Sequence, residues 1–282
     1  MNPNEQKSVA AAIAEAVGKL HCSRLQLSGA GEIISNNSSS SATIDMTRGV
    51  SLFGGPHTGF LVNGYALLDA VMQRRKLRKD FCTKHHVSER QGIIVQSNFE
   101  ELGSVFIKTS EIEQWPNEAV FCHNDLTPRN IIIQSRTSSN GSSYYKLAAI
   151  IDWELAGFYP PSYELSLQDT YLSGGNRRLS FYLLLKKHLK ELVPRSSSQI
   201  ALCQAMELVW ESRHQLLYNG NNIPAHIRKR FLEKFCLIRD QDPYIGWVRD
   251  SKKEGPWDCS REAAEKLEDD VIEEILAKRS RP

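Results

Sequence analysis

The sequence predicts an α+β fold in which helical segments at both ends flank a short stretch of strands. Two observations lead to this class. Apolar residues recur at three- and four-residue steps near the N-terminus and through most of the chain after Ser162, as in amphipathic helices. Between Trp115 and Asp152 the pattern changes to short runs rich in β-branched and aromatic residues, as in strands. The 282 residues suffice for one large domain or two small ones.

The first part of the chain predicts helices around one long loop. Residues 5–20 and residues 65–81 each place apolar side chains on one helical face. Residues 28–60 are rich in Ser, Gly and Asn and predict an irregular loop. Within it, Gly29-Ala30-Gly31 is a weak phosphate-loop candidate, because no strand pattern precedes it and no Lys-Ser or Lys-Thr follows. Residues 92–109 are ambiguous, but their apolar spacing is compatible with a third helix.

The middle of the chain predicts three short strands. They are "AVFCH" (119–123), "NIIIQ" (130–134) and "YYKLAAIID" (144–152), and the turn-rich "SRTSSNGSS" between the last two predicts a hairpin. Helical patterns then return and continue toward the C-terminus. They cover residues 181–192, 198–217, 225–238 and 261–278.

Composition narrows the class of partner. The formal net charge is only +2, and Lys and Arg are spread along the chain, so we expect no nucleic-acid partner. The N-terminal apolar pattern is interrupted by charges, which predicts neither a signal peptide nor a membrane span. The six cysteines form no Cys-x-x-Cys pair, which suits a reducing compartment. These features predict a soluble cytoplasmic protein, and they leave its oligomeric state open.

The turn "CHNDLTPRN" carries the candidate chemistry. Asp125 and Asn130 are oxygen donors on this turn, and Asp152 ends the next long apolar strand. Mg²⁺ favours one or two carboxylates with an amide oxygen, which Asn130 and Asp152 could supply. Asp125 would then be free to accept the proton of an attacking hydroxyl. The alternative is that Asp125 and Asn130 only satisfy backbone groups of their own turn.

At these residues the chain resembles the aminoglycoside phosphotransferase (APH) family of the protein-kinase-like fold, particularly its fungal members. "CHNDLTPRNIII" resembles the family's catalytic loop, and "IIDWELAGFYPPSYE" resembles its metal-binding segment. The resemblance implies that Asp125 is the catalytic Asp and that Asn130 and Asp152 bind Mg²⁺ and, through it, ATP. It also implies that His123 supports the loop and that the acceptor is a hydroxyl of a small molecule.

The resemblance also implies a domain organisation. Residues 1–250 would form the mainly helical C-terminal lobe of the kinase-like fold, containing the Ser/Gly-rich loop at 28–60 and the catalytic and metal-binding segment at 119–164. Residues 251–282 would form a charged helical tail. The family's N-terminal β-rich lobe, with its Gly-rich loop and strand lysine, is expected to be absent. Lysines such as Lys84 are instead expected on or near helices.

Three functions therefore stay open. The first is an ATP-dependent phosphotransferase that is impaired because one wall of the nucleotide site is missing. The second is a non-catalytic kinase-like remnant or binding module, produced by a truncated gene model. The third is a metal-dependent hydrolase that would use His123, Asp125 and Asp152.

Overall fold

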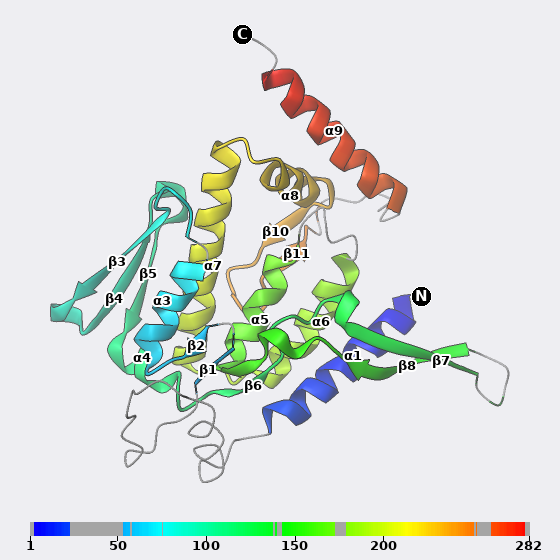
Figure 1. Cartoon of the computed structure of the whole chain (residues 1–282), viewed down its shortest axis with the longest axis horizontal. Coiled ribbons are helices and arrows are strands. Elements are labelled where there is room, and N and C mark those ends of the chain that lie inside the picture. The colour runs from blue at the N-terminus through cyan, green and yellow to red at the C-terminus, as the bar shows by residue number, and fades with distance from the viewer. Residues whose placement is uncertain are drawn as a thin grey trace, which may run out of the picture.

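The fold combines helices with several small antiparallel sheets, so the predicted α+β class is confirmed. It is seen in a computed structural model (Figure 1). The structure describes residues 3–22, 53–56, 58–74, 76–137, 139, 143–172, 179–250, 252 and 261–279. Its helices are α1 (Pro3–His21), α3 (Gly64–Arg74), α4 (Thr109–Gln114), α5 (Pro161–Thr170), α6 (Leu179–Leu189), α7 (Ser197–Asn219), α8 (Ile223–Lys234) and α9 (Arg261–Arg279).

Among the described residues the strands form four antiparallel groups, and the expected site residues lie on the segments that directly follow or precede strands of the first two. A four-stranded sheet has the order β2 (Gly59–Phe60), β1 (Gly54–Gly55), β9 (Gly157–Tyr159) and β6 (Val120–Cys122), and β7 (Ile131–Thr137) pairs with β8 (Ser143–Ile150). The predicted hairpin in the middle of the chain is therefore confirmed. The other groups are β3 (Cys82–Val87), β4 (Gly92–Ser97) and β5 (Ser104–Lys108), and the pair β10 (Leu237–Arg239) and β11 (Trp247–Arg249).

The prediction of a third helix at residues 92–109 was wrong. The segment forms β4, the short 3-10 helix η2 (Glu100–Leu102) and β5. Ile93 and Val95 are fully buried and alternate with less buried neighbours, a period of two that packs one strand face into the core. β-Branched residues favour this arrangement, because their side chains fit the pleated surface of a sheet. The change also places Lys84 on strand β3, where it pairs with Asp69, rather than on or near a helix.

Two further expectations need correction. The helix predicted for residues 65–81 ends at Arg74, and residues 76–80 are mostly exposed and non-helical. Like charges at neighbouring helical positions repel, and the basic run there offers little apolar surface to offset this. The end of the loop predicted for residues 28–60 contains the short strands β1 and β2. Gly29-Ala30-Gly31 lies outside the described residues.

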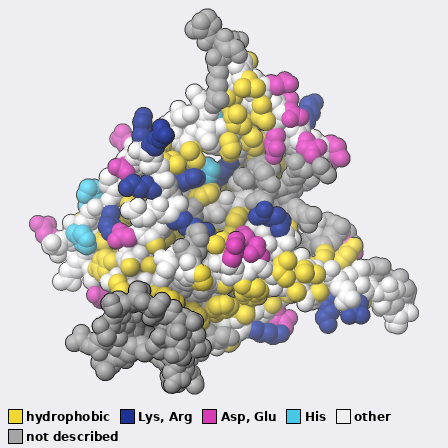
Figure 2. Space-filling model, viewed as in Figure 1, with side chains coloured by type: hydrophobic (Ala, Val, Ile, Leu, Met, Phe, Trp, Pro, Cys, Tyr) yellow, Lys and Arg dark blue, Asp and Glu magenta, His cyan; other side chains and the backbone are white. Residues whose placement is uncertain are grey.

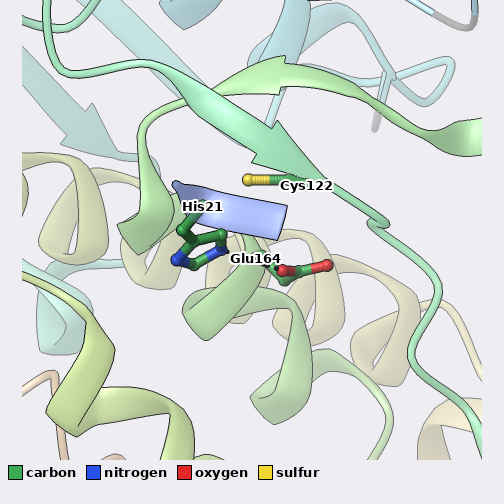
Figure 3. A group of neighbouring side chains, drawn as sticks. All are labelled: His21, Cys122 and Glu164. Carbon is green, nitrogen blue, oxygen red and sulfur yellow. Dashed lines mark ion pairs between the residues drawn. The ribbon is translucent and has the colours of Figure 1, made fainter. Parts of the chain in front are cut away.

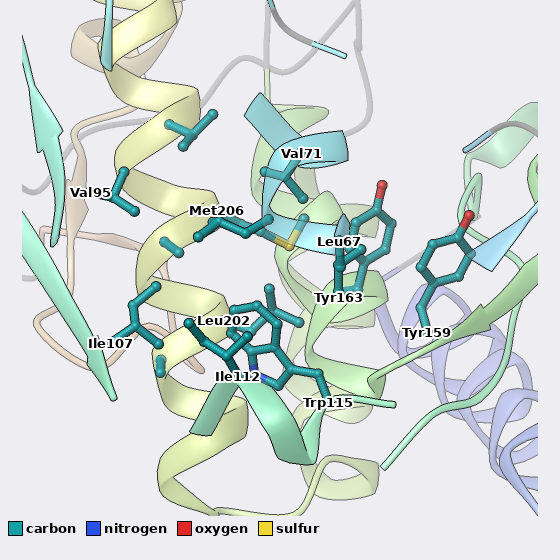
Figure 4. Packing of buried hydrophobic residues seen from close by; sticks show 14 of the residues in the cluster. Leu67, Val71, Val95, Ile107, Ile112, Trp115, Tyr159, Tyr163, Leu202 and Met206 are labelled. Carbon is teal, nitrogen blue, oxygen red and sulfur yellow. The ribbon is translucent and has the colours of Figure 1, made fainter. Parts of the chain in front are cut away.

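The largest hydrophobic cluster lies between the β3–β4–β5 sheet and helices α3, α5 and α7 (Figure 4). Ile93 and Ile107 face each other across β4 and β5, and both are fully buried. Trp115 is also fully buried, and its Nε1 donates to the Ser198 carbonyl oxygen at 2.9 Å. This bond satisfies the one polar atom of the indole, so the large ring can occupy the core without an unpaired donor.

A second cluster packs α1 behind the predicted catalytic turn. Val9, Ile13 and Val17 of α1 join Leu126 from the turn and Leu165 from α5, and all five side chains are buried. Leu126 directly follows Asp125, and Leu165 directly follows Glu164. The opening helix therefore supports the turn from behind, and its predicted apolar face at residues 5–20 is confirmed.

Helix α9 is joined to the rest of the fold by a smaller hydrophobic cluster. Helix α9 packs on α8 through Leu267, Val271 and Ile275, which meet Ile223 and Ile227. Within the part of the chain that the structure describes, no helix combines the length and apolar character needed to cross a bilayer.

The role of the β3–β4–β5 sheet in the core can be tested with two identical substitutions. We expect Ile107→Ala to lower the free energy of unfolding by about 2–5 kcal/mol, because it leaves a cavity at a fully buried position. Ile238→Ala removes the same atoms from a side chain that is 47% exposed, and we expect about 1 kcal/mol or less. Urea denaturation measures both values. Equal losses for the two variants would contradict the placement of Ile107 in the core.

Candidate active site

The expected site residues lie on one continuous path through β6, a turn, the β7–β8 hairpin and the residues after it. The turn leaves β6 at His123 and ends in the 3-10 helix η3 (Pro128–Asn130), after which β7 begins. Ile131 pairs with Ile150 across the hairpin, and Ile151 N donates to the Asn130 carbonyl oxygen at 2.9 Å. The hairpin therefore brings residue 130 beside residues 151 and 152, although more than 20 residues separate them in sequence.

Asp125 and Asn130 are in direct contact. The Nδ2 group of Asn130 donates to Oδ2 of Asp125 at 2.8 Å and to its carbonyl oxygen at 2.9 Å. Asn130 is buried, and these two bonds fix the orientation of its amide. Because the amide nitrogen is directed at Asp125, the amide oxygen is the atom left for another partner. Asn130 thus both positions the Asp125 carboxylate and keeps one oxygen donor available.

Asp152 leaves the hairpin in an unusual backbone conformation. Its φ is 66° and its ψ is 67°, a left-handed conformation that costs a non-glycine residue of order 1–2 kcal/mol. The residue is exposed and immediately precedes the 3-10 helix η4 (Trp153–Leu155). Folding therefore maintains a strained turn that presents a carboxylate to solvent at the open end of the hairpin.

His123 connects the two halves of this arrangement. The Asp125 backbone N–H donates to His123 Nδ1 at 3.2 Å, so the other ring nitrogen carries the proton and donates to the Ile151 carbonyl oxygen at 2.9 Å. The imidazole is fully buried, and Trp153 meets it edge-on at 4.6 Å between ring centroids. Both nitrogens are engaged with backbone groups, an arrangement that suits loop support and leaves none for a metal.

A buried carboxylate, which the sequence patterns did not reveal, holds the turn from the opposite side. Oε1 of Glu164, in α5, accepts hydrogen bonds from the backbone N–H groups of both His123 and Asn124, each at 2.8 Å. Glu164 is almost completely buried. Asn124 has a φ of 65°, and its Nδ2 donates to the Leu155 carbonyl oxygen at 3.0 Å. Two backbone amides beyond the last paired residue of β6 are thereby satisfied.

Tyr171 is a second residue that the sequence patterns did not single out. Its hydroxyl donates to the Asn124 carbonyl oxygen at 3.1 Å. Burial raises the pKa of the Tyr171 phenol well above its usual value, and the negative charge of Asp125 adds to the rise. The phenol therefore remains a protonated donor beside the predicted catalytic turn. Tyr171 carries no local sequence signal, and Glu164 ends the segment "IIDWELAGFYPPSYE" without any local sign of this contact, because each reaches the turn from more than 40 residues later in the chain.

A separate cavity lies away from these residues. It has a volume of about 380 Å³, lies between β5, α7 and the chain near β10, and is not lined by Asp125, Asn130 or Asp152. Its charged lining consists of Glu207, Glu211 and Arg239, and Arg239 already pairs with both glutamates. We assign this network to the attachment of β10 to α7 rather than to the site.

A comparison with known protein families identifies the same family that the motifs in the sequence resemble. Residues 1–168 match the family described as APH, "Phosphotransferase enzyme family", which covers more than half of the chain and includes every expected site residue. No significant match was found among curated proteins or among solved structures.

The bonds made by Glu164 can be tested by replacing it with an isosteric neutral residue. We expect Glu164→Gln to lower the free energy of unfolding by about 1.5–3 kcal/mol, because two backbone donors lose a charged acceptor. Amide hydrogen exchange should accelerate at His123 and Asn124. Glu191→Gln is the matched control, since the Glu191 side chain is largely exposed, and its effect should stay within about 0.5 kcal/mol. Unchanged exchange at both amides in Glu164→Gln would disprove this role.

Proposed function

From the premise that this chain belongs to the APH phosphotransferase family, we propose that it transfers the γ-phosphate of ATP to a hydroxyl of a small molecule with the help of Mg²⁺. The observation that carries the proposal is the contact between Asp125 and Asn130 at the base of the β7–β8 hairpin. The other strand of that hairpin leads directly to Asp152. A carboxylate for the acceptor and two oxygen donors for a cation thus meet at one end of the hairpin.

The donor set fits Mg²⁺. An amide oxygen from Asn130 and an exposed carboxylate from Asp152 are hard oxygen ligands, and few protein ligands suffice because phosphates and water complete the octahedron. When bound, the cation would neutralise charge that develops on the transferred phosphoryl group. Asp152 and Asn130 are the residues that would hold it.

Asp125 is proposed to act on the acceptor. Its carboxylate accepts a hydrogen bond from the acceptor hydroxyl and so orients the oxygen toward the γ-phosphorus. A new bond forms between this oxygen and the γ-phosphorus, the bond from the γ-phosphorus to the bridging oxygen breaks, and ADP leaves. The hydroxyl proton passes to Asp125. The Asn130 amide holds the carboxylate in place during this transfer.

An apolar surface beside the two metal donors supports the nucleotide part of the proposal. Ile132 is 44% exposed and Ile151 is 41% exposed. Ile131 and Ile150 pair across the hairpin and pack on the core, so their neighbours Ile132 and Ile151 are expected on the opposite face, because side chains alternate along a strand. Figure 2 shows hydrophobic side chains gathered over this part of the molecule. Such a surface suits the flat apolar face of an adenine ring.

The exposure of the side chains around Asp152 favours a second candidate function, in which the chain binds a nucleotide but turns it over inefficiently. Ile151 and Trp153 flank Asp152, and both are substantially open to solvent. Phosphoryl transfer benefits from excluding water around the reacting groups. We therefore propose that catalysis by this chain alone is impaired. The hydrolase alternative is less well supported, since both ring nitrogens of His123 are occupied.

Two substitutions separate these functions. We expect Asp125→Asn to lower Mg²⁺-dependent ATP turnover by at least about 100-fold, because the proton acceptor is lost, while the thermal shift caused by Mg·ADP is retained. Asp152→Asn should remove most of that shift, because it removes a ligand of the cation. Phosphate release and differential scanning fluorimetry measure the two effects.

Asp270→Asn, on an exposed position of α9, is the matched control and should change neither quantity. A Mg·ADP shift without turnover in the unaltered protein would support the binding module. Turnover that persists in Asp125→Asn would overturn the proposed role of Asp125.

A further inference from the structure

Behind the catalytic turn, three side chains of metal-ligating type lie close together. They are His21 at the end of α1, Cys122 at the end of β6 and Glu164 in α5 (Figure 3). One potential ligand atom from each lies within 4.8 Å of the other two. Cys122 and Glu164 are buried, and the His21 side chain is only 11% exposed. Three elements that are distant in sequence thus converge on one enclosed point.

The polar atoms at this point are unsatisfied. Glu164 uses Oε1 for the backbone of the catalytic turn, but its Oε2 accepts no hydrogen bond from any residue that the structure describes. Both ring nitrogens of His21 are buried and also make none, although Nε2 lies 3.5 Å from Glu164 Oε2. Buried polar atoms are nearly always bonded, so three such atoms in one place require an explanation.

We propose that His21, Cys122 and Glu164 bind a divalent transition-metal ion of the zinc class. A thiolate, an imidazole and a carboxylate are ligands that zinc accepts together, whereas Mg²⁺ avoids sulfur and prefers oxygen. In a tetrahedral zinc site, ligand atoms lie about 3.3–3.8 Å apart, given bonds of about 2.0–2.3 Å. The separation of His21 Nε2 and Glu164 Oε2 already fits, and the sulfur must approach by about 1 Å or less.

Charge balance supports a dication at this point. The buried Cys122 thiol donates to the Tyr159 carbonyl oxygen, as a protonated thiol does. On binding, the thiol would release its proton to solvent and give up its contact with the Tyr159 carbonyl oxygen. The two negative charges of a thiolate and a carboxylate then offset a charge of +2, and a metal-bound imidazole is neutral. The occupied cluster carries no net charge, which suits its burial.

Such an ion would act on the catalytic turn indirectly. Cys122 directly precedes His123, and Oε1 of Glu164, the oxygen that does not face the cluster, holds the backbone of His123 and Asn124. Binding would therefore connect α1, β6 and α5 behind the turn. This cluster shares no residue with the proposed magnesium site.

Cobalt(II) provides a direct test, because thiolate ligation produces a charge-transfer band in the near ultraviolet and tetrahedral ligation produces intense visible bands. We expect the chelator-treated full chain to bind one equivalent of Co²⁺ with both features. Zn²⁺ should abolish the bands and raise the melting temperature, and a large excess of Mg²⁺ should do neither. No nucleotide is present, so the result is independent of the proposed phosphotransferase activity.

Variants then assign the ligands. Cys122→Ser should lose the charge-transfer band, and His21→Gln should weaken Co²⁺ binding by at least about tenfold. Cys203→Ser is the matched control, since Cys203 is a buried cysteine outside the cluster, and it should bind as the unaltered chain does. Circular dichroism checks folding, and His21→Gln keeps the test valid if Cys122→Ser does not fold. Absence of the bands, or bands that survive in both cluster variants, would overturn the proposal.

Discussion

The candidate site depends on one buried carboxylate. Glu164 is removed from water, at a cost that must be offset by hydrogen bonds, and two backbone N–H groups of the turn provide them. The same bonds satisfy two backbone amides beyond Cys122, the last residue of β6 that pairs with β9. Breaking these bonds would leave the Glu164 carboxylate and the amides of His123 and Asn124 buried and unpaired, so the bonds fix α5 relative to the turn.

The remaining order of the site follows from backbone contacts. The Asp125 amide donates to His123, whose other nitrogen donates to the Ile151 carbonyl oxygen. The turn is thereby joined to the far strand of the β7–β8 hairpin. Asp125 and Asp152 approach the same region from separate strands, and the imidazole between them is held on both sides. The backbone contacts of His123 therefore position Asp125 and Asp152 although these two side chains need not touch each other.

Packing behind the turn supplies the rigidity that hydrogen bonds alone would not. Leu126 directly follows Asp125, and Leu165 directly follows Glu164. Both leucines enter the same hydrophobic cluster as α1. Close-packed interiors resist small displacements, so movement of the turn would disturb this cluster. The larger cluster around α7 and the β3–β4–β5 sheet extends to Cys122 and Tyr163, which directly precede His123 and Glu164, and stabilises the fold as a whole.

The sequence by itself determined the α+β class, the helix at the start, the hairpin and the family, because each rests on local periodicity or on residues close together in the chain. It predicted Asp125, Asn130 and Asp152 as a set but not their contacts. Residues 92–109 were misassigned because short apolar runs fit both helical and strand spacing, and packing against α7 selected the strands. Only the tertiary structure revealed Glu164, Tyr171 and the cluster with His21. These side chains meet the turn from distant elements, and no local pattern encodes a contact that long-range packing creates.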